Sequence, residues 1–258
     1  MTSGIRAAVM RGGTSKGVFV AEADLPSEPA ERDDLILRIL GSPDPDQIDG
    51  LGGTAATTSK FAYVGVSAQA GVDLEYAVAA VGVDVPIVDW SGTCGNLTAA
   101  VVPFALAVGL IERAGPSSTV TLLNRSTGGR VRVTVELDDG QARTTGATHI
   151  DGVPSPGSPI LCEYVDPAGG VLGAAMPTGG PLDYGDFDGQ KVPVTVFDVT
   201  HPYAFVPVDV LDHRETPAAV NADPALLARL ELLRGEVAAQ LGVVSDPSEA
   251  VTSSPSVP

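Results

Sequence analysis

The sequence predicts an α+β protein in which β-rich segments surround one buried helix. The main observation is the stretch 97–111, in which only Thr98 is polar. A helix that is apolar on every side is normally buried or spans a membrane. This stretch is shorter than a membrane span and contains Pro103, so we expect a central helix inside a globular domain. The second observation is a series of short apolar runs separated by glycine-rich turns, which is typical of strands.

Composition and charge narrow the class of protein. The chain has 258 residues, enough for one large or two ordinary domains, and its net charge is −17. A chain this acidic cannot form a broad basic patch, and we therefore expect no nucleic-acid partner. Two cysteines fit a reducing cytoplasm, and no Cys/His cluster has metal-ligand spacing. The opening residues are too polar for a signal peptide or a membrane span, and we therefore expect a cytoplasmic protein without a membrane partner.

The first half reads as β-rich around the central helix. A short amphipathic helix is expected over 29–40, followed by a loop over 41–50, and the central helix over 95–111. The apolar runs predict strands at 5–10, 17–21, 61–66, 74–81, 85–88, 119–123 and 130–137.

Two glycine-marked loops of this half carry groups suited to anions or proton transfer. Arg11, Ser15 and Lys16 lie among glycines whose backbone N–H groups can converge on a ligand, but the phosphate-loop spacing is absent. The alternative is an ordinary glycine-rich hairpin turn. Lys60 ends a hydroxyl-rich loop beside an apolar strand, where it can serve as a base, although an isolated lysine is usually a solvated surface charge.

A third loop leads into the central helix. Cys94, Gly95 and Asn96 stand at its start, where unpaired backbone N–H groups favour an anion and lower a thiol pKa. This position predicts a reactive or anion-binding site at the mouth of the core helix.

The second half begins near Gly146 and contains strands, turns and one amphipathic helix. Asp223 is expected to cap the start of this helix, with Pro224 at its first position, and the helix is expected to run to about Leu241. Strands are expected at 159–165, 192–198 and 204–208. Cys162, in the first of these, is expected to be a packed core or surface thiol, since no motif makes it a catalytic partner of Cys94, and 245–258 has the composition of a linker.

Taken together, the motifs resemble those of the 2-methylaconitate isomerase family, which includes 4-oxalomesaconate tautomerases and 3-methylitaconate isomerases. The resemblance rests on MRGGTSKG, on the GG-x4-TSK stretch ending at Lys60, and on CGN followed by PFA. It continues through HIDGVPSPGSPI, MPTG and D-x-x-H-P, where the family more often has Asn-Pro. It implies a diaminopimelate epimerase-like fold of two similar halves, each a curved, mostly antiparallel sheet around a central helix, with the active site between them.

The resemblance also implies residue roles. Lys60 is similar to the family's acid/base lysine, Cys94 to its cysteine at the helix start, and Ser15 to its loop serine. The implied reaction is a cofactor-independent, metal-independent isomerisation of a small anionic polycarboxylate, in which Lys60 takes a proton and Cys94, or Lys60 again, returns one. Carboxylates would be held by Arg11, Gly13, Thr14, Ser15, Ser59, Gly95 and Asn96.

The second half departs from the family pattern, because no apolar-all-round helix occurs between Gly146 and Pro258. The expected domains are therefore 1–145, a first epimerase-like domain, and 146–258, a partial second one. Either the chain is truncated or a partner supplies the missing element, which makes a homo-oligomer a hypothesis. A non-catalytic member of the family that binds a ligand or partner stays open as the alternative. A hydrolase with a cysteine nucleophile is the third alternative, and a decarboxylase or epimerase of the same fold also stays open. The sequence does not choose among the polycarboxylates on which the family acts.

Overall fold

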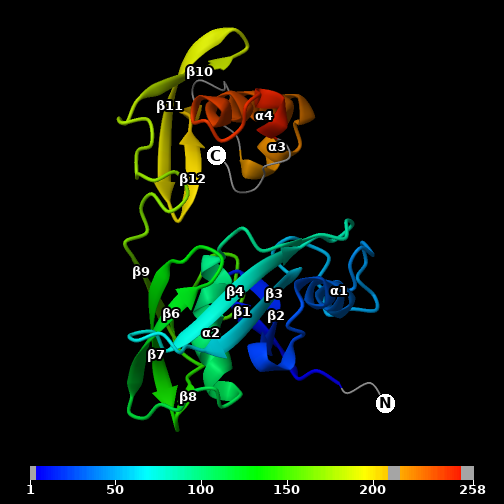
Figure 1. Ribbon diagram of the computed structural model, residues 1–258, viewed down its shortest axis with the longest axis vertical. Coiled ribbons are helices and arrows are strands. Elements are labelled where there is room, and N and C mark those ends of the chain that lie inside the picture. The colour runs from blue at the N-terminus through cyan, green and yellow to red at the C-terminus, as the bar shows by residue number, and fades with distance from the viewer. Residues whose placement is uncertain (1–3, 209–215, 251–258) are drawn as a thin grey trace. The chain divides into compact units, whose positions relative to one another are not determined.

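The computed structural model describes residues 4–208 and 216–250, and it divides the chain into two compact units, Met1–Asp166 and Pro167–Pro258 (Figure 1). The first unit is a nine-stranded sheet with two helices, and the second is a three-stranded sheet with helices on one face. The predicted α+β class is confirmed.

The sheet of the first unit runs in the order β1-β2-β3-β4-β6-β7-β8, with β5 beside β4 and β9 beside β7. Its pairs are antiparallel except β2–β3 and β4–β6, and each parallel pair is joined by a helical crossover, as parallel neighbours require. The strands are β1 Ala7–Gly12, β2 Ser15–Ala21, β3 Lys60–Val66, β4 Leu74–Val81, β5 Val88–Asp89, β6 Ser117–Asn124, β7 Arg130–Asp138, β8 Gln141–Ala142 and β9 Ile160–Val165.

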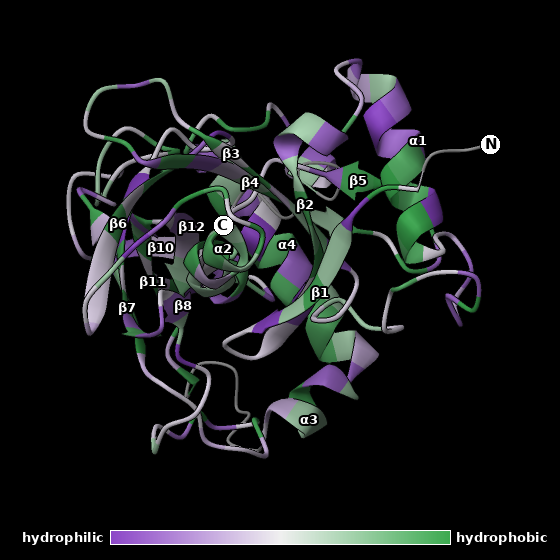
Figure 2. Cartoon of the chain, turned by 90° about the horizontal axis from the view of Figure 1, so that it is seen from below, coloured by the Kyte–Doolittle hydropathy of each residue, from purple (hydrophilic) through white to green (hydrophobic). Residues whose placement is uncertain are grey.

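The central helix α2, Gly95–Ala107, forms the core of this unit. Seen along its axis, the strands curl around it (Figure 2). Its buried side chains pack in one cluster with buried residues of five strands, β2, β3, β4, β6 and β7, which explains why it has no polar face. The predicted helix end at Ile111 was wrong. Gly109 has φ +73°, and the N–H groups of Gly109 and Leu110 bond back to Leu106 and Ala105, which closes the helix.

Helix α1, Pro29–Leu40, lies on the opposite face of the sheet and has the predicted bounds. It follows the short 3₁₀ turn η1, Glu22–Asp24. Its Ile36 and Leu40 are fully buried against the outward side chains of β2, β3 and β4. The sheet is therefore covered on both faces, which agrees with the long apolar runs of its central strands.

The second unit packs helix α4, Pro224–Gln240, on a sheet of β10 Asp183–Phe187, β11 Gln190–Val199 and β12 His201–Phe205. The predicted cap is confirmed, because the Asp223 carboxylate accepts a hydrogen bond from Leu226 N at 3.0 Å. Helix α3, Pro217–Asn221, and strand β10 were not predicted, since each is too short for a clear period.

The linker-like tail begins with more order than its composition predicted. Asp246 caps the 3₁₀ turn η3, Pro247–Glu249, and Ala250 is fully buried. The remaining residues of the predicted tail, 251–258, lie outside the described part of the chain.

The first unit extends beyond the boundary expected after residue 145. Strand β9 pairs with β7 along its whole length, from Ile160 opposite Val135 to Val165 opposite Arg130, and so belongs to the first sheet. A strand's own residues do not reveal its partner, so the sequence pattern places the boundary at the Pro/Gly-rich connection before β9. Within 4–208 and 216–250, no helix is both long and apolar enough to span a membrane.

Candidate active site at the start of the central helix

The site lies at the first turn of α2. Cys94 is the N-cap residue, and its side chain makes no capping hydrogen bond. The Thr98 backbone N–H and hydroxyl both donate to the Cys94 carbonyl, at 2.9 and 3.0 Å. The N–H groups of the first helical turn point away from the helix without intrahelical acceptors, which makes this end favourable for an anion.

The turn between β1 and β2 is held against this helix end by Asn96. The Asn96 side-chain oxygen accepts from Thr14 N at 3.1 Å, and its amide donates to the buried Ser15 hydroxyl at 3.3 Å. A Cβ on Gly12 would lie 2.0 Å from the Asn96 carbonyl oxygen, and one on Gly13 would lie 2.1 Å from the side-chain oxygen. The glycines therefore allow a backbone contact that no side chain would permit. The structure brings Gly13, Thr14, Ser15 and Asn96 together.

Arg11 lies on the exposed rim of the same turn. Its guanidinium donates to the Gly13 carbonyl at 2.7 Å, so it is folded over its own loop. In this position it adds positive charge beside the turn and stabilises the conformation of Gly13, whose φ is +50°.

Lys60 begins β3 on the side of the sheet that faces α2. Side chains alternate along a strand, and Ala62 and Val64 belong to the cluster around α2, so Lys60 shares their face. A Cβ on Gly17 would meet both the Lys60 carbonyl oxygen and Leu97 of α2 at 2.9 Å, which fixes the strand start beside the helix. In the described part of the chain, Lys60 has no ion-pair or side-chain hydrogen-bond partner.

Ser59 is the last residue of the loop before β3. Its side chain is fully buried, and its hydroxyl accepts a hydrogen bond from Gln47 Nε2 at 2.9 Å. Its carbonyl accepts from Val81 N, which ties the end of the loop to β4. Through these two bonds Ser59 supports the start of β3 beneath Lys60.

Several polar residues behind the helix start were missed by the sequence reasoning. The Tyr76 hydroxyl is 2.9 Å from the Thr98 hydroxyl, and burial raises the pKa of Tyr76 above its ordinary range. The Asn124 amide donates to Thr93 at 3.1 Å, beside Cys94. The sequence does contain a signal for Tyr76, because it is a polar residue at an inward position of an otherwise apolar strand.

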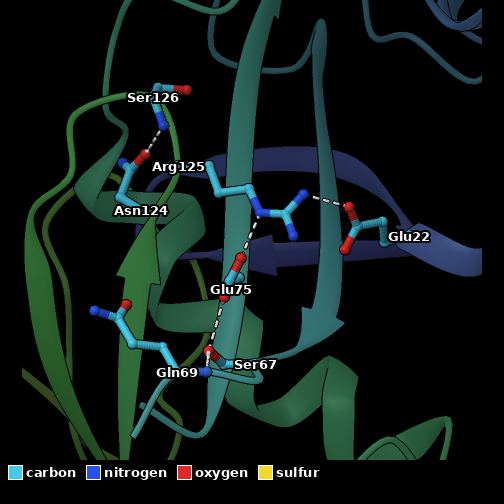
Figure 3. Close-up of polar contacts among 7 residues, drawn as sticks. All are labelled: Glu22, Ser67, Gln69, Glu75, Asn124, Arg125 and Ser126. Carbon is cyan, nitrogen blue, oxygen red and sulfur yellow. Dashed lines mark hydrogen bonds and ion pairs between the residues drawn. The ribbon is translucent and has the colours of Figure 1, made fainter. Parts of the chain in front are cut away.

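An ion cluster next to Asn124 fixes the β6–β7 turn (Figure 3). Arg125 pairs with Glu75 at 2.6 Å and with Glu22, and Glu75 also accepts from the Ser67 hydroxyl at 2.7 Å. The hydrogen bond from Ser67, which is the largest single cause, and the hydrogen bond and charge of Arg125 lower the pKa of Glu75. All charges of the cluster are paired with one another, so it is a structural connection between η1, β4 and the turn.

These features define a class of protein: an α+β domain whose sheet curls around a buried helix and presents anion-binding groups at that helix's start. No cluster of three or more His, Cys, Asp and Glu side chains that could hold a metal occurs in the described ranges.

The family model for PrpF protein matches residues 2–258, and the chain belongs to the PrpF family. The chain is 39% identical over 252 residues to 3-methylitaconate isomerase of Eubacterium barkeri, covering 97% of this chain and 66% of that protein. It is 37% identical over 265 residues to 2-methyl-aconitate isomerase of Shewanella oneidensis, covering 96% and 66%.

A crystal structure of methylitaconate-delta-isomerase superimposes with a TM-score of 0.80 at 38% identity, covering 97% of this chain and 65% of that one. The resemblance stated from the motifs is confirmed, as is the diaminopimelate epimerase-like fold that it implied. The chain spans about two thirds of the length of these relatives.

Proposed function

We propose that this chain is a cofactor-independent isomerase that moves a proton between two carbons of a small unsaturated polycarboxylate. The observation that carries the proposal is the meeting of three elements at one helix end. The first turn of α2 offers N–H groups, the β1–β2 turn is held there by Asn96, and β3 begins alongside with Lys60.

The proposed reaction needs only proton transfer. Lys60, as the amine, takes a proton from a carbon next to a carboxylate, and the electron pair shifts the double bond by one position. The negative charge that develops on the carboxylate is stabilised by the N–H groups at the start of α2 and by the β1–β2 turn. Lys60, as the ammonium, returns the proton at the far carbon and is again an amine. Alternatively, Cys94 gives the proton, and the Cys94 thiolate then regains one from solvent while the Lys60 ammonium releases its own, so the reaction is balanced without an oxidant or reductant.

The relatives support the substrate class. Those named 3-methylitaconate isomerase, 2-methyl-aconitate isomerase and 4-oxalomesaconate tautomerase act, by their names, on unsaturated polycarboxylic acids. We propose the same class for this chain, and we propose that the second unit is part of the second epimerase-like half.

Deuterium exchange followed by NMR tests the proposal. The protein is incubated in deuterium oxide with 2-methylaconitate, methylitaconate and oxalomesaconate, and wash-in of deuterium at an allylic or vinylic carbon is measured. We expect wash-in with at least one acid and a loss of about 10²-fold or more in Lys60→Ala, because a positioned base contributes about 10²–10⁴-fold.

Lys191→Ala is the matched control, since Lys191 is an exposed lysine on β11. Equal wash-in by wild type and Lys60→Ala, or none with any of the three acids, would refute the proposal.

A further inference from the structure

Two polar side chains interrupt the apolar inner face of the first unit's sheet. They are Tyr76 on β4 and Asn124 on β6, which are 0% and 2% exposed and lie opposite each other where the two strands pair in parallel. The inner residues next to them on these strands, Leu74, Val78 and Leu122, are apolar and buried. Buried polar groups cost free energy unless hydrogen bonds replace those to water, and an apolar pair would pack here without that cost. The pair therefore needs a reason beyond the core.

Tyr76 is connected to the backbone of Cys94 through Thr98. The Tyr76 and Thr98 hydroxyl oxygens are 2.9 Å apart, and the Thr98 hydroxyl donates to the Cys94 carbonyl at 3.0 Å. Because Thr98 has a single hydroxyl proton and gives it to the carbonyl, Tyr76 is the donor to Thr98. Burial raises the pKa of Tyr76, so its phenol keeps the proton that this bond requires. The three groups thus form one chain of hydrogen bonds that ends on the Cys94 carbonyl.

Asn124 holds the residue on the other side of Cys94. Its side-chain oxygen accepts from Ser126 N at 2.8 Å (Figure 3), and its amide nitrogen donates to the Thr93 hydroxyl at 3.1 Å. Cys94 therefore lies between two attachments to the sheet, while its own side chain makes no capping hydrogen bond. The thiol packs, partly buried, against the cluster around α2, so the backbone and this packing set its direction.

We propose that Tyr76, acting through Thr98, is a positioning residue that fixes the direction in which the Cys94 thiol gives its proton to the far carbon of the substrate. The inference rests on the proposed function and chooses Cys94 as the donor, whose thiolate then regains a proton from solvent. A donor has to lie within hydrogen-bond reach of the carbon that it protonates, and a displacement of about 1 Å can cost about 10²-fold in rate. A buried and fully paired network resists such a displacement.

Deuterium oxide separates the two proton transfers in one experiment. Lys60 alone suffices for wash-in at the carbon that it deprotonates, because it can return a deuteron to the same carbon, whereas the isomer forms only when the far carbon is protonated. Both rates are measured by NMR with 2-methylaconitate, methylitaconate and oxalomesaconate for the wild type, Tyr76→Phe, Thr98→Val and Thr98→Ser. Val120→Ala is the matched control, since Val120 is a fully buried apolar residue of the same sheet face.

We expect Tyr76→Phe and Thr98→Val to lower the rate of isomer formation about tenfold or more, while wash-in into the recovered substrate stays within about twofold of wild type. Thr98→Ser restores the hydroxyl and should restore isomer formation. Val120→Ala should lower the thermal unfolding midpoint and leave the ratio of isomer formation to wash-in at the wild-type value, because its cavity lies in the core and not in the network.

Alkylation of Cys94 by iodoacetamide, in a Cys162→Ala background, tests the positioning without turnover. Thr98→Val should raise the rate constant about threefold or more, because a partly buried thiol that loses its restraint becomes more accessible. Thr98→Ser and Val120→Ala should leave this rate constant at the wild-type value.

Equal losses of isomer formation and wash-in in Tyr76→Phe, or a loss in Thr98→Val that Thr98→Ser does not restore, would show a purely structural role and overturn the proposal. Isomer formation that neither Tyr76→Phe nor Thr98→Val changes would also overturn it. If the wild type turns over none of the three acids, the proposed function fails separately. The alkylation rate then decides the positioning: a rise in Thr98→Val supports it, and an unchanged rate overturns it.

Discussion

The loop that carries Lys60 is held by one buried amide, and its removal gives a quantitative test of the site's support. Gln47 is 2% exposed. Its Nε2 donates to the Ser59 hydroxyl at 2.9 Å, and its Oε1 accepts from Thr54 N at 2.8 Å. Gln47→Met keeps the length of the side chain and removes both partners.

The cost follows from where the two orphaned groups lie. Ser59 is fully buried, so its hydroxyl cannot bond to water once the Gln47 amide is removed. Leaving this hydroxyl without a partner is expected to lower the free energy of unfolding by about 1–3 kcal/mol. Thr54 is exposed, so its N–H can bond to water and contributes less. We expect Gln47→Met to lower the free energy of unfolding of the first unit by about 2–3 kcal/mol.

Urea unfolding followed by the fluorescence of Trp90 measures this change. Trp90 is the single tryptophan of the chain and lies in the first unit, where its indole donates to Asp33 at 2.9 Å, so the signal reports on that unit. Gln69→Met is the matched control, because the Gln69 side chain is exposed (Figure 3) and should change the free energy by less than about 0.5 kcal/mol.

A double-mutant cycle separates the hydrogen bond from general loss of packing. Ser59→Ala combined with Gln47→Met should be less destabilising than the two single changes added, with a coupling energy of about 1 kcal/mol or more. Additive effects, or a Gln47→Met protein as stable as Gln69→Met, would show that the amide does not hold the loop.

Two further predictions concern titratable groups. The lowered pKa of Glu75 means that its stabilising effect is complete above the unfolded value near 4.5 and is lost as the pH falls through the folded value. Glu75→Gln should therefore lower the free energy of unfolding by up to about 1 kcal/mol at pH 7 and leave it unchanged at a pH below the folded pKa. Glu163→Gln is the control, because its ion pair with Arg132 is more exposed, and it should have no effect at either pH. A loss of stability in Glu75→Gln that does not depend on pH would contradict the prediction. Burial raises the pKa of Cys162 to about 11, so in a Cys94→Ala background its alkylation by iodoacetamide should be slow at pH 8 and rise toward pH 11; a rate at pH 8 equal to that of the urea-unfolded protein would refute the burial argument.

Sequence patterns predicted those elements whose period is long and regular. Helix α1 and strand β4 have the predicted bounds, because amphipathic and apolar repeats of that length leave little ambiguity. The end of α2 was not predicted, since the residues after Ala107 remain apolar and only the positive φ of Gly109 stops the helix. The pairing of β9 with β7 was not predicted either, because pairing is a property of two segments and not of one.

The same reasoning explains which parts of the site could be predicted. Glycines and polar residues at loop positions indicated the β1–β2 turn and the start of α2, and Asn96 joins them as expected. The hydrogen bond from Gln47 to Ser59 was not predicted, because the two residues are 12 positions apart and no local pattern links them. Tyr164 stands beside Gly95 only because the sheet curls around the helix, a contact that no local pattern contains.

The polarity of α2 explains why its first turn is the place for chemistry. Beyond Thr98 the helix is apolar and most of its side chains are buried, whereas its first turn is surrounded by hydroxyl and amide groups from four strands and two loops. Nearly all of these groups satisfy one another and so hold the turn rigidly, which is what an anion site needs to act without reorganisation. The N–H groups of the turn itself are the donors left without intrahelical acceptors, and the proposed carboxylate site uses them.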